Sequence, residues 1–177
     1  MIDRLSSEEI AAAVRSASHE LFSTMLQLPL EADAPYDETA EPESLDGVVA
    51  LVGIAGSWTG TGRIACTPQF ACRLAGALLM QPYEAVDEEV LDAVAEVSNM
   101  IIGNVKTIFE EKLGPLALSV PTVIFGRNYR THSSGVPKWT VIPFQTGEDS
   151  WNISFCVIPT KMHPHPQAAR PEVVHVA

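Results

Sequence analysis

Residues 87–113 read DEEVLDAVAEVSNMIIGNVKTIFEEKL, and this stretch predicts a long amphipathic helix around which the rest of the chain is organised. At 3.6 residues per turn its apolar side chains recur on one stripe, which must face a core. The inward stripe comprises Val90, Val94, Val97, Ile101, Val105 and Ile108, with Leu91, Ile102 and Phe109 beside it. Gly114 and Pro115 then end the helix.

The opposite side of this predicted helix carries residues three or four positions apart, which makes them neighbours on its surface. We call this set the polar stripe: Asp92, Glu96, Asn99, Gly103, Lys106 and Glu110. In a helix interior Asn costs roughly half a kcal/mol and Gly about 1 kcal/mol relative to Ala. Helix stability therefore did not select Asn99 and Gly103, which favours a functional stripe. A solvated helix surface is the alternative, because a short Glu-x-x-Asn pattern is common on such surfaces.

The composition is that of a globular protein: 177 residues, 46% hydrophobic and 19% charged. We expect a single domain over residues 1–160 and a flexible tail over 161–177, where His163 and His165 lie among prolines. A net charge of -11 argues against nucleic acid as a partner, because binding to phosphates depends on clustered Lys and Arg.

Cysteine usage and hydropathy indicate a cytoplasmic protein. Cys66, Cys72 and Cys156 are odd in number and form no CxxC pair, so neither a disulfide framework nor a zinc site is predicted. No apolar run approaches the roughly 18 residues that a membrane span needs, and no signal peptide is predicted.

The remaining elements predict an α+β fold, an α/β sandwich in which long helices cover a mostly antiparallel sheet. A helix from Ser7 to about Gln27 directs Ile10, Val14, Leu21 and Met25 inward, and an acidic, Pro-rich connector or extended approach to the sheet follows over 28–43. Strands 47–58 and 59–67 form a hairpin, in which Gly56, Gly60 and Gly62 indicate turns and close packing rather than a phosphate loop. A short helix begins at Pro68 and ends before Gln81.

The second half of the chain is predicted to be rich in strands, at 116–125, 138–145 and 151–158, with the last two forming a hairpin. A long connection over 126–137 contains Arg127, Arg130 and His132, of which His132 is read as a solvated loop residue. Alternation in the hairpin predicts one apolar face made of Trp139, Val141, Trp151, Ile153 and Phe155. The outer strand would then pair with a second copy, which predicts a symmetric homodimer.

With these elements placed, the chain resembles the CheX/CheC family of chemotaxis phosphatases, which dephosphorylate the response regulator CheY. The resemblance covers roughly residues 5–160 and rests on Asp92, Glu96, Asn99 and Pro121, on the texts EVSNMIIGN and SVPTVIFG, and on a hairpin carrying GxGR. Twenty-one residues separate Asn99 from Pro121, one fewer than in the family pattern, as a one-residue loop difference would produce. The nearest second motif, Asp149-x-x-Asn152, lies on a predicted hairpin, so the chain resembles the one-site CheX type, whose members form dimers through their sheets.

The resemblance implies a phosphatase acting on the aspartyl phosphate of a CheY-like receiver. Glu96 and Asn99 would be the catalytic residues, and Asp92, Gly103, Lys106 and Pro121 would contribute to docking. The protein would hold no metal or cofactor of its own, because the receiver carries the Mg²⁺. The alternative is a non-catalytic module that binds receivers or resembles the flagellar switch proteins.

Overall fold

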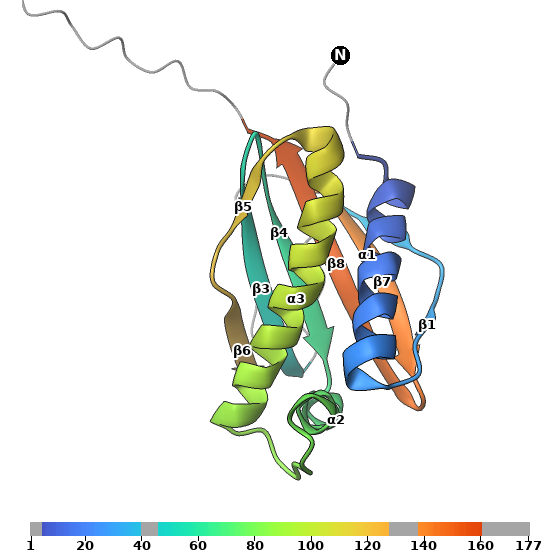
Figure 1. Cartoon of the computed structure of the whole chain (residues 1–177), viewed down its shortest axis with the longest axis vertical. Helices are drawn as coiled ribbons and strands as arrows, with labels where there is room; N and C mark the ends of the chain where they lie inside the picture. Colours follow the sequence, from blue (N-terminus) through green and yellow to red (C-terminus); the bar gives the residue numbers. More distant parts are fainter. Residues whose placement is uncertain (1–4, 40–45, 128–137, 161–177) are drawn as a thin grey trace, which may run out of the picture.

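A computed structural model describes residues 5–39, 46–127 and 138–160, in which two long helices lie side by side over one face of an eight-stranded antiparallel sheet (Figure 1). The helices are α1 (Ser7–Leu21), continued by the π-helical turn η1 (Phe22–Leu26), α2 (Pro68–Leu79) and α3 (Glu88–Leu113). The strands are β1 (Glu31–Ala32), β2 (Tyr36–Glu38), β3 (Gly47–Gly56), β4 (Trp58–Cys66), β5 (Leu116–Leu118), β6 (Thr122–Gly126), β7 (Trp139–Thr146) and β8 (Asp149–Pro159). The predicted α+β class is confirmed.

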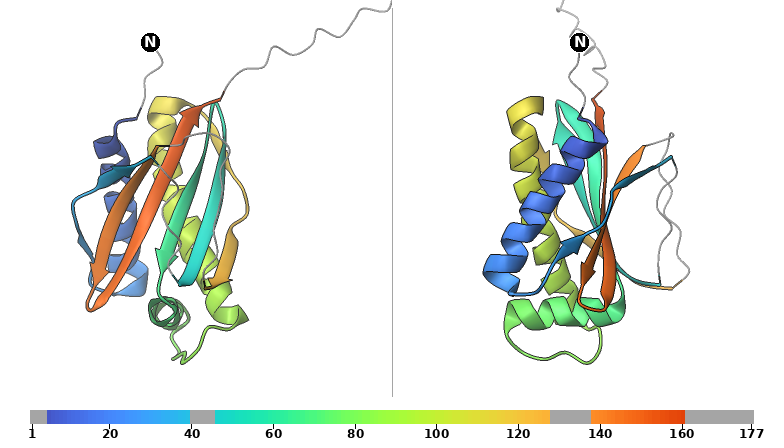
Figure 2. Two further views of the ribbon diagram at one scale, coloured as in Figure 1. Left: turned by 180° about the vertical axis from the view of Figure 1, so that it is seen from behind. Right: turned by 90° about the vertical axis from the view of Figure 1, so that its right-hand side faces the viewer.

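The sheet has the order β1-β7-β8-β4-β3-β5, with β2 also paired to β7 and β6 also paired to β3. Figure 2 shows α1 and α3 on the same side of this sheet, while α2 lies across its end. The main core fills the space between the helices and the sheet, where rings such as Phe109 and Phe155 meet edge to face at 5.7 Å.

Helix α3 follows the prediction closely. Asp87 precedes it as the N-cap, its side chain accepting a hydrogen bond from the backbone N–H of Val90 at 2.9 Å, and Gly114 ends it with φ of 78°. Five of the six predicted inward residues are buried, but Ile108 is 40% exposed. The last inward step from Val105 is four residues rather than three, so Phe109 takes the buried position.

Helix α1 begins as predicted, with a capping box between Ser6 and Glu9, but it ends differently. The turn Phe22–Leu26 is π-helical, and Gln27 leaves it with φ of 52°. A wider turn changes which side chains face inward. Leu26 is therefore buried, whereas Met25, predicted to face the core, is 49% exposed.

The two predicted hairpins and the short helix are confirmed. Strands β3 and β4 pair from Val48 with Cys66 onward, β7 and β8 pair across a two-residue turn, and Pro68 is the first residue of α2. The 28–43 connector contains β1 and β2, so its extended alternative is correct for these residues. Both short strands pair with β7.

The single strand predicted for 116–125 is in fact two strands joined by a bulge. Leu118 pairs with Ile54 and Thr122 with Leu51, so three residues of one strand oppose two residues of β3. Within the bulge the Ser119 hydroxyl accepts a hydrogen bond from the N–H of Gly53 at 2.8 Å. Pro121 has no N–H with which to continue the ladder, which explains the interruption.

The prediction of one apolar face on the C-terminal hairpin is wrong. Ile142 pairs with Ile153 and Phe144 with Trp151, and these four side chains belong to the main core under the helices. Side chains alternate along a strand, so the odd-numbered residues of β7 project to the other face. There Trp139, Val141 and Cys156 form a separate buried cluster.

Several predictions lie outside the described residues. These concern the connection over 128–137, with Arg130 and His132, and the tail over 161–177, with His163 and His165. The division into one domain and a tail stays a prediction. Within the described residues, no helix is both long enough and apolar enough to span a bilayer.

Replacing Gly60 should separate two central strands, because a β-carbon there would lie 2.0 Å from the carbonyl oxygen of Cys156 on β8. We expect Gly60→Ala to lower the free energy of unfolding by about 1–3 kcal/mol, the usual cost of overpacking. The control is Gly103→Ala, whose added β-carbon meets nothing within 4 Å and which should raise this free energy by up to about 1 kcal/mol. Urea denaturation measures both, and a Gly60→Ala protein as stable as wild type would contradict the packing described here.

Candidate functional site

The polar stripe lies on the outer side of α3, opposite the residues that pack on the sheet. Asp92, Glu96 and Asn99 are exposed, and each is one turn from the next on the same helical face. Gly103 continues the stripe, and the space above it is open, because an added β-carbon would meet nothing within 4 Å. A partner can therefore approach the helix backbone at Gly103, next to Asn99.

The first three residues of the stripe have no side-chain partners among the described residues. In the part of the chain that the structure describes, no hydrogen bond or ion pair engages the side chains of Asp92, Glu96 or Asn99. Two carboxylates and a carboxamide are thus presented with their hydrogen-bonding capacity available. The two ends of the same helix differ, because polar side chains there are held by hydrogen bonds or ion pairs.

The C-terminal end of the stripe is held by Glu110. One carboxylate oxygen accepts a hydrogen bond from the backbone N–H of Leu116 at 2.8 Å, and the other lies 3.0 Å from the ammonium of Lys106. The Leu116 hydrogen bond, and after it Lys106, lowers the pKa of Glu110. Because the backbone of β5 anchors Glu110, Lys106 has a defined place on the stripe.

The N-terminal end of α3 is held by the segment that leads into it. The hydroxyl of Tyr83 donates a hydrogen bond to Glu89 at 2.7 Å, and the side-chain amide of Gln81 lies against both groups. The bond to Glu89 raises the pKa of Tyr83. Together with the Asp87 cap, these contacts fix the first turn of the helix, four residues before Asp92.

Pro121 comes to this region from a separate segment. It is half-buried in the bulge between β5 and β6, and both strands pack against α3. The structure therefore brings five predicted site residues together on one helix and places the sixth on the neighbouring sheet edge. Glu110 was noted in the stripe but not as a site residue, although its spacing of four from Lys106 is the signal for an ion pair.

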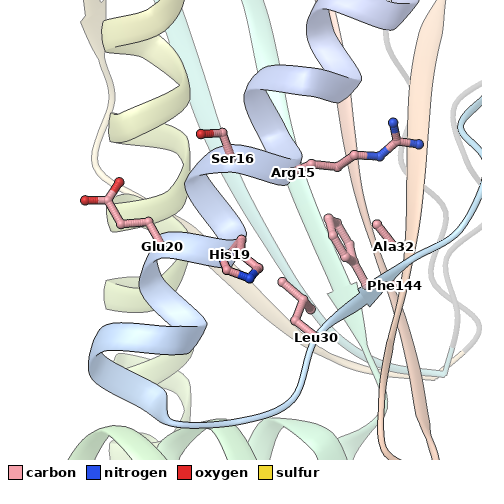
Figure 3. A pocket seen from close by; sticks show the side chains of 7 residues that line it. All are labelled: Arg15, Ser16, His19, Glu20, Leu30, Ala32 and Phe144. Carbon is pink, nitrogen blue, oxygen red and sulfur yellow. The ribbon is translucent and has the colours of Figure 1, made fainter.

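A hollow between α1 and β1 is a less suitable site (Figure 3). Its one cation, Arg15, already donates a hydrogen bond to the carbonyl oxygen of Asp33 at 3.1 Å and lies 3.6 Å from Glu8. Neither an activated nucleophile nor a pair of converging carboxylates lines it. Among the described residues there is likewise no group of three or more His, Cys, Asp and Glu side chains placed to hold a metal ion.

Comparison with known families gives a match to the family described as chemotaxis phosphatase CheX, over residues 48–145, which is more than half of the chain. A search of curated proteins found no match. The matched range contains α3, the whole polar stripe and Pro121.

Solved structures show the same fold. The chemotaxis protein CheX from Desulfovibrio desulfuricans is 28% identical, with a TM-score of 0.73, covering 85% of this chain and 99% of that one. The CheX–CheY–BeF₃–Mg²⁺ complex from Borrelia burgdorferi matches at 24% identity and a TM-score of 0.72, covering 87% and 99%. FliY from Thermotoga maritima matches at 18% identity and a TM-score of 0.64, covering 90% and 93%. The last two likenesses concern the fold alone.

The anchored ion pair predicts an unusual titration. The Glu110 carboxyl should titrate below its ordinary value of 4.5 in the folded protein, as followed by ¹³C NMR. Lys106→Met should move the midpoint upward without restoring 4.5, because the Leu116 N–H remains. A lowered folded pKa means that this contribution to stability is present above the unfolded pKa and is lost as pH falls through the folded value. A midpoint at or above 4.5 in the wild type would contradict the arrangement.

Proposed function

We propose that this chain, which belongs to the CheX family of chemotaxis phosphatases, hydrolyses the aspartyl phosphate of a CheY-like receiver domain. The observation that carries the proposal is the set of Asp92, Glu96 and Asn99, which share an exposed face of the capped helix α3 and have no hydrogen-bond or ion-pair partner among the described residues. The solved complex of a CheX with CheY supports a receiver as the partner. A cytoplasmic location follows from this substrate.

The proposed reaction needs little chemistry from this protein. Hydrolysis of an acyl phosphate requires a water held in line with the breaking P–O bond, while positive groups neutralise the phosphoryl oxygens. The receiver supplies that charge through its own Mg²⁺ and Lys, so the phosphatase needs no metal. The remaining task is to position the water.

Asn99 is suited to this task. Its carboxamide oxygen can accept a hydrogen bond from the water, while the amide nitrogen donates one to the phosphoryl group. A carboxamide is not a strong base, so its contribution is positional. The open space above Gly103 lets the receiver reach the depth at which Asn99 meets the phosphoryl group.

Glu96 lies one turn from Asn99 on the same face, and its carboxylate can form a charge-assisted hydrogen bond with the receiver's Lys. This contact would set how deeply Asn99 enters the receiver's site. Asp92 and Lys106 extend the docking surface along the helix on either side, and Pro121 contributes from the sheet edge.

The alternative is a non-catalytic receiver-binding or flagellar-switch-like module, since FliY has the same fold. Such a module would bind the receiver without changing how long the phosphoryl group survives. The unobstructed Asn99 favours catalysis, because a module that only binds has no need of a water-positioning group at the centre of its surface.

Asn99→Ala should reduce receiver dephosphorylation at least about 100-fold, the scale of loss when a reacting group is no longer positioned. The fold should persist, because Ala is the better helix former by roughly half a kcal/mol. Loss of ³²P from a phosphorylated CheY-type receiver measures the rate. Asn104→Ala is the matched control, an exposed Asn on α3 outside the stripe, and it should leave the rate unchanged. Equal rates for wild type and Asn99→Ala would remove Asn99 from the mechanism.

Glu96→Gln keeps the shape of the side chain and removes its charge. We expect KM for the phosphorylated receiver to rise about tenfold, which is the loss of one charge-assisted contact, and the salt dependence of kcat/KM to become weaker. Glu111→Gln, an exposed acid of the same helix outside the stripe, is the control. If both variants show the same KM, Glu96 makes no ion pair with the receiver.

We also propose a symmetric homodimer, which agrees with the presence of a single Glu-x-x-Asn motif in the sequence. The outer edge of the C-terminal hairpin, which the sequence predicts to pair, is unsuitable because β1 and β2 already occupy the outer side of β7. The dimer would then use another surface. Sedimentation equilibrium should give about twice the chain mass of 19.1 kDa at micromolar concentration, and a species of 19.1 kDa would refute the proposal.

A further inference from the structure

Strand β6 carries apolar side chains on the same face of the sheet as α3. Phe125 pairs with Val48 and Val123 with Ala50, and both partners are buried in the core beneath the helices. Paired residues project to the same face of a sheet. Phe125 and Val123 therefore project to the face of the sheet that the helices cover, and Phe125 is 50% exposed there. We call this pair the apolar ledge.

The ledge runs beside the polar stripe. Strand β6 packs against α3, and Figure 1 places it along the N-terminal half of that helix. This is the half that carries Asp92 and Glu96. An apolar surface and an acidic surface thus lie next to each other on one side of the molecule.

The ledge is held firmly although it lies at an edge. Val123 packs against the main core, and five consecutive residues of β6 pair with β3. The preceding bulge is fixed at Ser119, whose N–H donates to the carbonyl oxygen of Gly53 at 2.9 Å and whose hydroxyl accepts from the N–H of the same residue. An exposed aromatic ring on a fixed strand loses little conformational entropy on binding.

We infer that the apolar ledge is the second half of the receiver-docking surface and that it receives an apolar side chain beside the receiver's phosphorylation site. This inference rests on the proposed function and deepens it. On this half of α3 the stripe alone offers the carboxylates of Asp92 and Glu96, whose attraction to a basic partner is screened by salt. Stable interfaces need a desolvated centre in which aromatic residues are enriched, and Phe125 is an exposed aromatic side chain on a strand that packs against α3.

Phe125→Ser tests the inference in the full-length protein. We expect Kd for a beryllofluoride-loaded CheY-type receiver, measured by calorimetry, to rise about tenfold, with KM following and kcat within twofold of wild type. Ile158→Ser is the matched control, because Ile158 is 51% exposed and pairs with Thr59 on the face away from the helices. Phe125→Leu, which keeps an apolar side chain, should stay within about threefold of wild type and shows that any loss is not due to misfolding.

The outcomes separate the two proposals. A wild type that binds the receiver without hydrolysis would overturn the phosphatase proposal, while a selective loss of binding in Phe125→Ser would still support the ledge. Equal Kd values for wild type and Phe125→Ser would overturn the ledge, even with full phosphatase activity. A halved mass of Phe125→Ser in sedimentation equilibrium, with Kd unchanged, would assign the ledge to a second copy and would also overturn the inference.

Discussion

The close approach of α3 to the sheet at Gly62 determines where the proposed site lies. Ile102 packs over this glycine of β4, and a β-carbon on Gly62 would come within 2.9 Å of the Ile102 side chain and 3.0 Å of Phe155. Because Gly62 has no side chain, α3 packs close to the sheet at this point. The residues that fill the surrounding space fix the rotation of α3 about its own axis. The polar stripe faces solvent because the opposite face of α3 is packed on the sheet in this way.

Helical periodicity and end signals predicted much of the fold, because α3 and α2 carry caps, a clear apolar face and breaking residues. The errors arose where a helical turn departed from the α-helical period or where a turn set the strand register. Met25 is exposed rather than buried because η1 is wider than an α-helical turn. Trp139 lies on the opposite face from the one predicted because the two-residue turn sets the register of the β7–β8 hairpin. Local sequence does not determine which strands pair. The bulge at Ser119 and the pairing of β1 and β2 with β7 therefore could not be predicted.

The candidate site was predictable to the extent that it lies on a single helix. Asp92, Glu96 and Asn99 share a face by their spacing alone, whereas the place of Pro121 depends on how β5 and β6 pair with β3. The ledge follows the same logic, because nothing in the text SVPTVIFG shows that Phe125 projects to the face that holds α3. The anchoring of Lys106 likewise depends on a backbone N–H of the following strand.

The covering of β7 by β1 and β2 sets the order in which the protein can be completed during synthesis. The Thr140 hydroxyl donates to Asp37 at 3.0 Å across 103 residues of chain, so this edge of the sheet closes only after the C-terminal hairpin has left the ribosome. At roughly 5–20 residues per second, α1 and its short strands wait on the order of 5–20 s for their partner. During that interval α1 lacks its contacts with β7, so part of its apolar face stays exposed to solvent.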